Sequence, residues 1–511
     1  MIQYSNKRIA VNTLIVYVEL FITIVVNLVL SRLVLQALGS SDFGLYNVVG
    51  GVIAMFTFIS GSLSVSTSRF LNYEMGKSDG DVNRIFNQSH ILHLSFATII
   101  LILLETFGIY YINNILNVEV GKESDAMFVF QVSTIAACIG IINVPFQSLF
   151  TSHEQFSIVA IVNISNVLIK LLVVVALLYY SGNALRFYAL GMSLVTLSSF
   201  IIYHRLGTRR WPEIVKWKPV SDWRSYKEQL FYSNWNLLST ASIVGRSQGS
   251  ALLINLFFGT VVNAAYAISL QVLQQVNNFV GRFDIAVAPQ ITQNLGGGHF
   301  ERSSYLAGKT CRVCILLMEV VLFPLFVELD YILHLWLGDN IPEGTLVFCQ
   351  YTLLIAIVSS TSGGLGQLIN GTSQIKWFKI QMFVWNMLPL LVGYFLYSKG
   401  AVPYMIVLLF VIGDILNRFV QLYLLNRLFR FNVRQFVIEA YLRPVIIFAV
   451  MFIVMSISNM LDYDTVAMHI CRIFVIIGLT FLLCFYVGLY SSERDKMLSY
   501  VRSKIIGSKG K

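Results

Sequence analysis

Long apolar runs, separated by short polar segments, dominate the pattern of this chain. A transmembrane helix needs about 20 mostly apolar residues to cross a hydrocarbon core of about 30 Å. Breaks at charged residues and at Gly, Asn and Pro clusters divide the chain into fourteen such runs. They predict an all-α polytopic membrane protein with about fourteen transmembrane helices. The predicted spans are residues 10–38, 48–69, 91–112, 126–147, 158–180, 185–203, 234–258, 260–291, 311–336, 344–370, 380–397, 401–424, 442–460 and 469–490.

A basic segment between the sixth and seventh spans divides the spans into two groups of six and a final pair. We therefore expect two six-helix lobes followed by a terminal helix pair. The predicted parts are an N-terminal six-helix lobe (1–203), a cytoplasmic basic linker (204–233), a C-terminal six-helix lobe (234–424), the terminal helix pair (442–490) and a basic cytoplasmic tail (491–511).

The two predicted lobes carry weak signs of an internal duplication. An offset of 220 residues aligns four identical residues in corresponding parts of the first two spans of each lobe, without a gap. Parallel repeats of this kind place a transport site at the interface between the halves. The aligned pairs are Gly39 and Gly259, Tyr46 and Tyr266, Gly61 and Gly281, and Gly76 and Gly296.

Polar residues inside several spans recur at helical spacing, which places them on one helix face. The stripes of the first, fifth and seventh spans include Glu19, Lys170 and Arg246, respectively. Such a stripe either lines a water-filled cavity or joins neighbouring helices by hydrogen bonds. For the eighth span, the number of polar residues around one cation favours the cavity. Its stripe consists of Gln271, Gln274, Gln275, Asn278 and Arg282.

The embedded cations predict an electropositive cavity that binds an anion such as a phosphate or pyrophosphate headgroup. Glu19 and Asp284 are candidates for ion or proton coupling, and structural ion pairs with other helices are the alternative. Asp414 and Arg418 stand four residues apart with the acid first, a spacing that predicts mutual neutralisation. The predicted substrate-binding residues are Arg246, Arg282, Lys170, Gln271, Gln274, Gln275 and Asn278.

Composition and charge agree with a membrane protein. Hydrophobic residues make up 56% of the chain and charged residues 12%, with a mean hydropathy of +0.71, which excludes an ordinary soluble enzyme. The net charge is +10, but the basic residues lie between spans, where they set topology, so no nucleic-acid partner is expected. Lys122, Arg186 and Lys399 fall on the predicted outside. This bias predicts cytoplasmic N- and C-termini.

The basic linker and the cysteines permit more than one interpretation. Residues 205–232 combine seven Lys and Arg with three Trp, which suits either a segment on the anionic inner leaflet or a solvated topogenic linker. Cys311 and Cys314 form a CxxC without a second pair, so we expect packing rather than a metal or redox site. The sequence has no GxxxxGK[ST], HExxH or GxGxxG motif. We expect no catalytic residues, no metal site and no cofactor.

One region resembles a known family. The run Leu38-Gly39-Ser40-Ser41-Asp42-Phe43-Gly44-Leu45-Tyr46-Asn47, followed by Ser68-Arg69-Phe70-Leu71 and Glu74-Met75-Gly76-Lys77, is similar to the opening of Wzx-type polysaccharide transporters. These O-antigen flippases belong to the multidrug/oligosaccharidyl-lipid/polysaccharide (MOP) exporter superfamily. The layout of two six-helix lobes and a terminal pair resembles this branch along the whole chain, whereas drug-exporting MATE relatives usually have twelve spans.

The resemblance implies two lobes that alternate between inward- and outward-open states, with Gly39 and Gly259 as hinges. It implies that an undecaprenyl-pyrophosphate-linked glycan is flipped across the bacterial inner membrane for surface polysaccharide such as lipopolysaccharide. Membrane lipids and other polysaccharide assembly proteins would be partners, and a proton gradient, sodium gradient or membrane potential would drive transport. Cationic residues in the central cavity of relatives match Arg246, Arg282 and Lys170 by location, not by motif.

Two other classes of function remain open from the sequence. A cation-coupled drug or metabolite exporter of the MATE type would need Asp284 or Glu19 and would tolerate neutral replacements of Arg246 and Arg282. A membrane enzyme such as a polysaccharide polymerase or ligase would need a large outside loop with catalytic groups. The longest predicted outside loop, residues 113–125, is too short for that.

Overall fold

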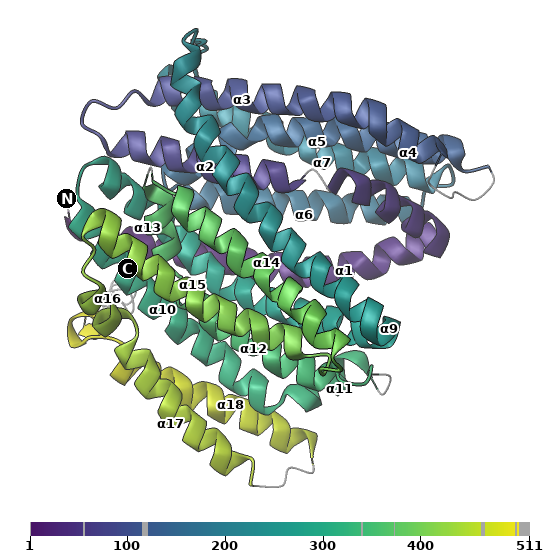
Figure 1. Ribbon diagram of the computed structural model, residues 1–511. Coiled ribbons are helices and arrows are strands. Elements are labelled where there is room, and N and C mark those ends of the chain that lie inside the picture. Colours follow the sequence, from purple (N-terminus) through teal and green to yellow (C-terminus); the bar gives the residue numbers. More distant parts are fainter. Residues whose placement is uncertain are drawn as a thin grey trace, which may run out of the picture. The chain divides into compact units, whose positions relative to one another are not determined.

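The computed structural model describes residues 2–54, 57–114, 121–338, 341–372, 374–460, 465–495 and 498–499. Within these ranges every regular element is a helix (Figure 1). The chain forms two compact units. Unit 1 comprises Met1–Ala241 and Thr292–His299, and unit 2 comprises Ser242–Ile291 and Phe300–Lys511.

Unit 1 is a bundle in which α5 packs on α7, α3 packs on α5, and α1 packs on α6 (Figure 1). Its core joins α1, α3, α4, α5 and α7 through buried side chains such as Leu104, Phe130 and Leu185. Side-chain caps fix two helix starts: Asp81 accepts from the Arg84 N–H and Asn183 from the Arg186 N–H. Its helices are α1 (Ile2–Ala54), α2 (Thr57–Gly76), α3 (Val82–Leu103), α4 (Ile109–Asn114), α5 (Glu123–Ser152), α6 (Phe156–Leu178), α7 (Ala184–Arg210) and α8 (Pro212–Val215), with a π-helical turn at Leu104–Gly108.

The longest helix, α9 (Trp223–Gly296), contributes to both units: its two ends belong to unit 1 and residues 242–291 to unit 2. It consists of two helices joined at a kink, where Gly259 has φ 81° and ψ −174°. This backbone conformation is open to glycine and strained for other residues. The predicted break between the spans 234–258 and 260–291 is therefore confirmed.

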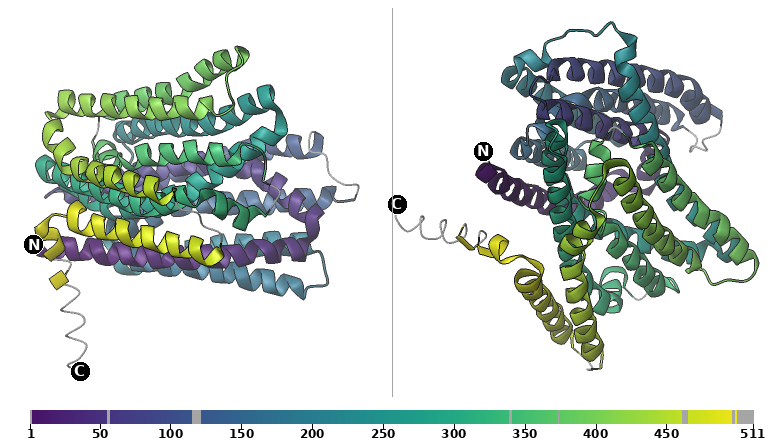
Figure 2. Two further views of the ribbon diagram at one scale, coloured as in Figure 1. Left: turned by 90° about the horizontal axis from the view of Figure 1, so that it is seen from below. Right: turned by 60° about the vertical axis from the view of Figure 1, so that its left-hand side comes forward.

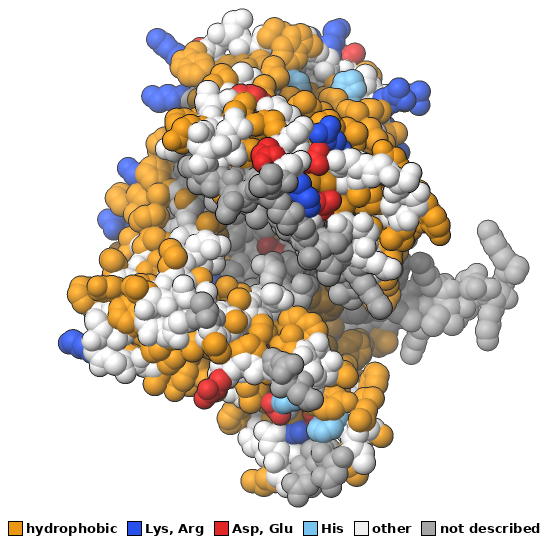
Figure 3. Space-filling view, turned by 90° about the vertical axis from the view of Figure 1, so that its right-hand side faces the viewer, with side chains coloured by type: hydrophobic (Ala, Val, Ile, Leu, Met, Phe, Trp, Pro, Cys, Tyr) orange, Lys and Arg blue, Asp and Glu red, His pale blue; other side chains and the backbone are white. Residues whose placement is uncertain are grey.

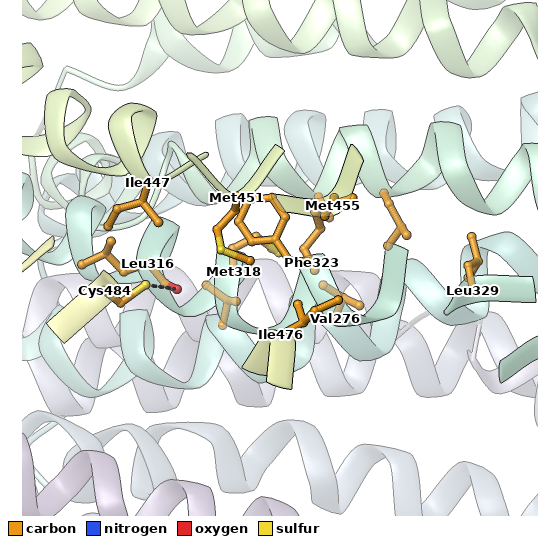
Figure 4. Close-up of a cluster of buried hydrophobic side chains, with 14 of the residues drawn as sticks. Val276, Leu316, Met318, Phe323, Leu329, Ile447, Met451, Met455, Ile476 and Cys484 are labelled. Carbon is orange, nitrogen blue, oxygen red and sulfur yellow. Dashed lines mark hydrogen bonds between the residues drawn. The ribbon is translucent and has the colours of Figure 1, made fainter. Parts of the chain in front are cut away.

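Unit 2 contains the remaining helices. Figures 1 and 2 show α17 and α18 side by side at one edge. Figure 4 shows how this pair is anchored: Met451 and Met455 of α17 and Ile476 of α18 pack around Phe323 of α10. The helices are α10 (Phe300–Val327), α11 (Leu329–Leu337), α12 (Thr345–Ser360), α13 (Leu365–Gly371), α14 (Lys376–Ser398), α15 (Met405–Phe429), α16 (Val433–Ala440), α17 (Leu442–Ser458) and α18 (Val466–Leu483), with a π-helical turn at Cys484–Gly488.

Nine helices in the described residues are long and apolar enough to cross a membrane, or ten if the bent pair α12 and α13 forms one span. Orange hydrophobic side chains cover much of the face drawn in Figure 3, as expected for lipid contact. These ten correspond to predicted spans, but the count of fourteen is not confirmed. The other four predicted spans lie on α1, α2 and α9. The helix α1 continues past the predicted end of the first span, through residues 38–48 to Ala54.

Ion pairs connect the segment after α18 to α10. Glu493 accepts from Lys309 Nζ at 3.0 Å and from Arg312 Nη2 at 2.8 Å. Burial by itself raises the pKa of Glu493, but Lys309, Arg312 and the Tyr490 N–H outweigh burial and leave this pKa below its usual range.

The depressed pKa predicts a pH-dependent stability. The interaction stabilises the fold fully above the ordinary Glu pKa of about 4.3 and is lost as the pH falls through the lower folded-state pKa. Glu493→Gln should lower the free energy of unfolding at pH 7 by roughly 1.5–3 kcal/mol, as for other hydrogen bonds to a charged group. The measurement is the melting temperature, which should fall accordingly. The difference from the parent should shrink below about pH 4, and the exposed Asp495→Asn should show neither effect. A pH-independent difference would contradict this prediction.

Candidate transport site

The polar stripe on α1 and α6 lies within unit 1 and is used mainly in contacts between helices. Glu19 is buried and accepts from Asn163 Nδ2 at 3.3 Å. One turn along α6, Asn166 accepts from Ser199 of α7 at 2.8 Å. These bonds fit the interhelical role that the sequence left open for this stripe.

Lys170 continues the same face of α6, one turn beyond Asn166. Its side chain is half-buried and makes no ion pair with any residue that the structure describes. A cation at this depth in a membrane helix usually meets a partner or a polar ligand. Lys170 therefore keeps its place as a candidate contact for an anionic substrate.

Arg246, in the unit 2 part of α9, has its charge balanced by Asp414 of α15. Two parallel hydrogen bonds, Nη1 to Oδ1 at 2.9 Å and Nη2 to Oδ2 at 3.0 Å, join the two side chains. Asn386 of α14 accepts a further bond at 3.3 Å, and the guanidinium lies 4.2 Å from the Phe410 ring centroid. Through these hydrogen bonds Arg246 links α9 to both α14 and α15.

The predicted pairing of Asp414 with Arg418 is wrong. Arg418 donates from Nε to Thr361 Oγ1 at 3.1 Å, and it also donates to Gln421. Spacing along one helix favoured the local pair, but the bidentate contact across helices satisfies both carboxylate oxygens.

The exposed polar face of α9 runs from Gln271 to Asn278, and Arg282 follows about one helical turn after Asn278. Gln271, Gln274, Gln275 and Asn278 are all exposed, and Gln274 donates to Asn278 at 2.9 Å. Arg282 is half-exposed on the same face. A face this polar is costly against hydrocarbon, so it calls for water or a polar ligand. Lys170 belongs to unit 1, whereas Arg246 and Arg282 belong to unit 2.

Asp284, the second coupling candidate, is held at a break between α12 and α13. Its Oδ1 accepts from the Gly364 N–H at 2.7 Å, and its Oδ2 accepts from Gln367 Nε2 at 2.8 Å. The helices bend by 53° at this break, and Gly364 has φ 68°. The sequence did not predict these partners or Asp414 and Asn386 as partners of Arg246. The run Ser-Ser-Thr-Ser-Gly-Gly at residues 359–364 was the available signal for the break.

The basic linker packs against α3 while it presents its charges outward. Asn83 Nδ2 donates to the carbonyl oxygens of Glu213, Ile214 and Lys216 at 2.8–2.9 Å. Trp217 and Trp223 remain 55% and 72% exposed, and the basic residues around them are exposed too. This surface agrees with either interpretation of the linker, as a solvated segment or a membrane-surface segment.

A family model described as "Polysaccharide biosynthesis protein" matches residues 5–295, more than half of the chain. The chain belongs to this family. No curated protein matched the chain. The family match confirms the resemblance of this chain to Wzx-type proteins of the MOP superfamily.

Solved structures show the fold of this family member. A MOP superfamily transporter from Pyrococcus furiosus, described as having a binding pocket of reverse polarity, matches with a TM-score of 0.68 at 14% identity, covering 84% of this chain and 96% of its own. A MATE structure in the straight conformation reaches 0.72 at 13% identity with the same coverage. An outward-facing multidrug resistance MATE transporter reaches 0.64 at 13% identity, again over 84% and 96%. The chain therefore has the all-helical, multi-pass fold of these MOP-type transporters.

Proposed function

We propose that this protein flips a polyprenyl-pyrophosphate-linked oligosaccharide from the inner to the outer leaflet of the bacterial inner membrane, by alternating access. The family match over residues 5–295 carries this proposal, because it connects a MOP-type fold with polysaccharide biosynthesis. The glycan and the pyrophosphate cannot cross hydrocarbon unaided, whereas the polyprenyl tail can stay in lipid. The transporter then needs a polar path only for the headgroup.

The polar face of α9 supports this use. Its exposed amides suit the hydroxyl groups of a glycan, and Arg282 at its end suits a phosphate oxygen. Because Asp414 balances the charge of Arg246, we do not assign pyrophosphate binding to Arg246. We assign it to Lys170 in unit 1 and to Arg282 in unit 2, where Arg282 lies at the end of the exposed polar face of α9. A proton or sodium gradient, or the membrane potential, drives the cycle, both termini are cytoplasmic, and other polysaccharide assembly proteins act beside the transporter.

Lys170→Gln and Arg282→Gln are each expressed in a strain that lacks the chromosomal gene. Each variant should restore less surface polysaccharide than the parent protein does, and the double variant should restore none. Each replacement removes a cation that would meet the pyrophosphate, and such contacts contribute about 1.5–3 kcal/mol. Lys216→Gln, on the exposed linker, is the matched control. Full activity of the double variant at normal protein level would rule out this assignment.

Deletion of the gene tests the function itself. We expect polyprenyl-pyrophosphate oligosaccharide to accumulate, as measured by mass spectrometry, and the corresponding surface polymer to be lost. Unchanged glycans with new drug sensitivity would overturn the proposal in favour of the MATE-type cation-coupled exporter.

A further inference from the structure

The basic linker returns toward the membrane after the chain leaves α7. The predicted span in α7 ends at residue 203, and the helix continues to Arg210, about 10 Å beyond the apolar part. The chain then runs back along α3, where the ring centroids of Trp217 and His90 are 5.8 Å apart. His90 immediately precedes the predicted span that begins at residue 91. Trp217 therefore lies level with the edge of the hydrocarbon core.

Two asparagine side chains of α3 hold this return in place. Asn83 Nδ2 and Asn87 Nδ2 both donate to the carbonyl oxygen of Lys216, at 2.9 and 3.1 Å. Asn87 is buried, and its Oδ1 accepts from the backbone N–H of Lys218 at 3.1 Å. Because these bonds fix the backbone on both sides of Trp217, the fold of unit 1 sets the position of this ring.

Trp217 lies on the side of α3 that carries exposed apolar residues. His90, Leu94 and Leu101 follow an i, i+4, i+11 spacing, which places them on one helix face. Leu94 and Leu101 are exposed, as expected for a face that meets lipid, and Trp217 covers His90 while it stays more than half exposed itself. Tryptophan is enriched where the hydrocarbon meets water. Trp217 occupies such a position.

Ring contacts bring the end of α7 to the same level. Both α3 and α7 pack on α5 (Figure 1). The Phe146 ring of α5 lies 5.5 Å from His90 and 5.1 Å from His204, measured between centroids. Arg205 follows His204 and stands one turn after Ile201, an exposed apolar residue of α7. The exposed apolar face of α7 thus ends in a cation.

Arg205 and Lys218 lie at the depth of the lipid headgroups. Arg205 is two residues, about 3 Å, past the predicted span of α7. Lys218 is bound by Asn87, which stands four residues, about 6 Å, before the predicted span of α3. A bilayer measures about 40–45 Å with its headgroups and about 30 Å without them, which leaves about 5–8 Å on each side. Both side chains are exposed, and neither forms an ion pair with any residue that the structure describes.

We infer that Arg205, Trp217 and Lys218 form a docking surface for the headgroups of anionic phospholipids. The two cations suit lipid phosphates, and the indole ring suits the boundary beside them. A soluble acidic protein fits this surface less well, because it would have to displace lipid to reach a ring at the edge of the hydrocarbon core. The basic linker is thereby a membrane-surface segment rather than a solvated one. This surface is separate from the residues proposed to bind the glycan and the pyrophosphate.

Purified full-length protein in detergent tests the surface without any glycan. Phosphatidylglycerol or phosphatidylcholine is titrated into the micelles, and the melting temperature is measured, because a ligand that binds the folded state stabilises it. We expect phosphatidylglycerol to stabilise the parent more than phosphatidylcholine does, and high salt to weaken the effect. Arg205→Gln/Lys218→Gln should need about 30-fold more phosphatidylglycerol for half of the stabilisation, as expected for two lost cations near an anionic surface.

Arg224→Gln/Lys227→Gln is the matched control, because it removes the same charge from exposed positions of the same linker. These residues stand ten and seven positions before the predicted span 234–258, about 15 and 10 Å from its start and so beyond the headgroups. The control should bind phosphatidylglycerol as the parent does. Both double variants should melt at the parental temperature in phosphatidylcholine, which shows that they are folded.

Quenching by brominated lipids locates the ring itself. Brominated phosphatidylglycerol should quench part of the tryptophan fluorescence of the parent, and Trp217→Phe should remove that part. Equal stabilisation by the two lipids, phosphatidylglycerol binding that survives Arg205→Gln/Lys218→Gln, an equal loss in the control variant, or quenching unchanged in Trp217→Phe would each overturn the proposed surface. None of these outcomes depends on the transported substrate, so they are distinguishable from a failure of the proposed function.

Discussion

Replacing Arg246 by Met should destabilise unit 2 by about 3–5 kcal/mol, because it leaves a largely buried Asp414 carboxylate without its partner. The side chains of Arg246 and Asp414 are only 18% and 17% exposed, and both carboxylate oxygens are bound by the guanidinium. Asp414→Leu should have a similar effect, because the remaining charge is then on the arginine. Thermal unfolding in detergent, followed by fluorescence-detected size exclusion, measures both variants.

The double variant Arg246→Met/Asp414→Leu distinguishes a structural pair from a substrate contact. Replacing both partners of a buried ion pair by apolar residues is often neutral, so most of the lost stability should return. Arg427→Gln, an exposed arginine on the same helix as Asp414, should change little. If Arg246→Met unfolds at the parental temperature but stops transport, Arg246 contacts the substrate, as the sequence predicted, and the structural role proposed for it is wrong.

Gly76→Ala and Gly296→Ala should each destabilise unit 1, by about 1–3 kcal/mol as for other overpacked contacts. The ends of α2 and α9 meet backbone to backbone in that unit. A Cβ on Gly76 would lie 1.9 Å from the Gln293 carbonyl oxygen, and one on Gly296 would lie 1.8 Å from the Tyr73 carbonyl oxygen. Neither oxygen belongs to a flexible side chain, so a helix must move to admit the methyl group.

The chain supplies matched controls for this prediction. Gly61 lies in α2 and Gly281 in α9, and a Cβ at either position would meet nothing within 4 Å. Alanine at these two positions should stabilise the helices by up to about 1 kcal/mol, since glycine is the weaker helix former. Melting temperatures of the four alanine variants give the comparison. Equal shifts for contact and control glycines would contradict the close packing of α2 on α9.

The contact between the ends of α2 and α9 involves one of the glycine pairs that the 220-residue offset aligns. Gly76 faces the carbonyl of Gln293, and Gly296 faces the carbonyl of Tyr73, so each glycine meets the residue three positions before its counterpart. The 220-residue offset relates both the two glycines and the two carbonyl residues. Sequence matching could identify the glycines, because close approach requires them, but it could not show that they touch.

Apolar spans were predictable because hydrocarbon imposes length and composition on a helix. Ten predicted spans correspond to helices that satisfy both criteria. Outside these ten, α1 contains the shorter apolar stretch Asn12–Asn27 within its described residues. Where a helix is interrupted was harder to predict: Gly259 marks a kink, whereas Gly39 lies inside the helical range of α1.

Partners across helices were not predictable from spacing. Arg246 and Asp414 are 168 residues apart. The alternative partner Arg418 lies on the same helix as Asp414, four residues later, which is the favoured spacing for an ion pair within a helix. Asp284 likewise receives its hydrogen bonds from residues 80 and 83 positions later in the chain. The sequence identified which embedded charges needed partners, because burying a charge is costly, but only the fold decides which partner each one meets.

Flipping of a lipid-linked glycan by purified protein in proteoliposomes tests the central claim most directly. Polyprenyl-pyrophosphate oligosaccharide is placed in the inner leaflet, and a glycan-cleaving enzyme that cannot cross the membrane reports its arrival in the outer leaflet. We predict protein-dependent cleavage that Lys170→Gln/Arg282→Gln abolishes and Lys216→Gln preserves. Equal cleavage in liposomes with and without the protein, under an imposed sodium or proton gradient, would contradict the proposed function.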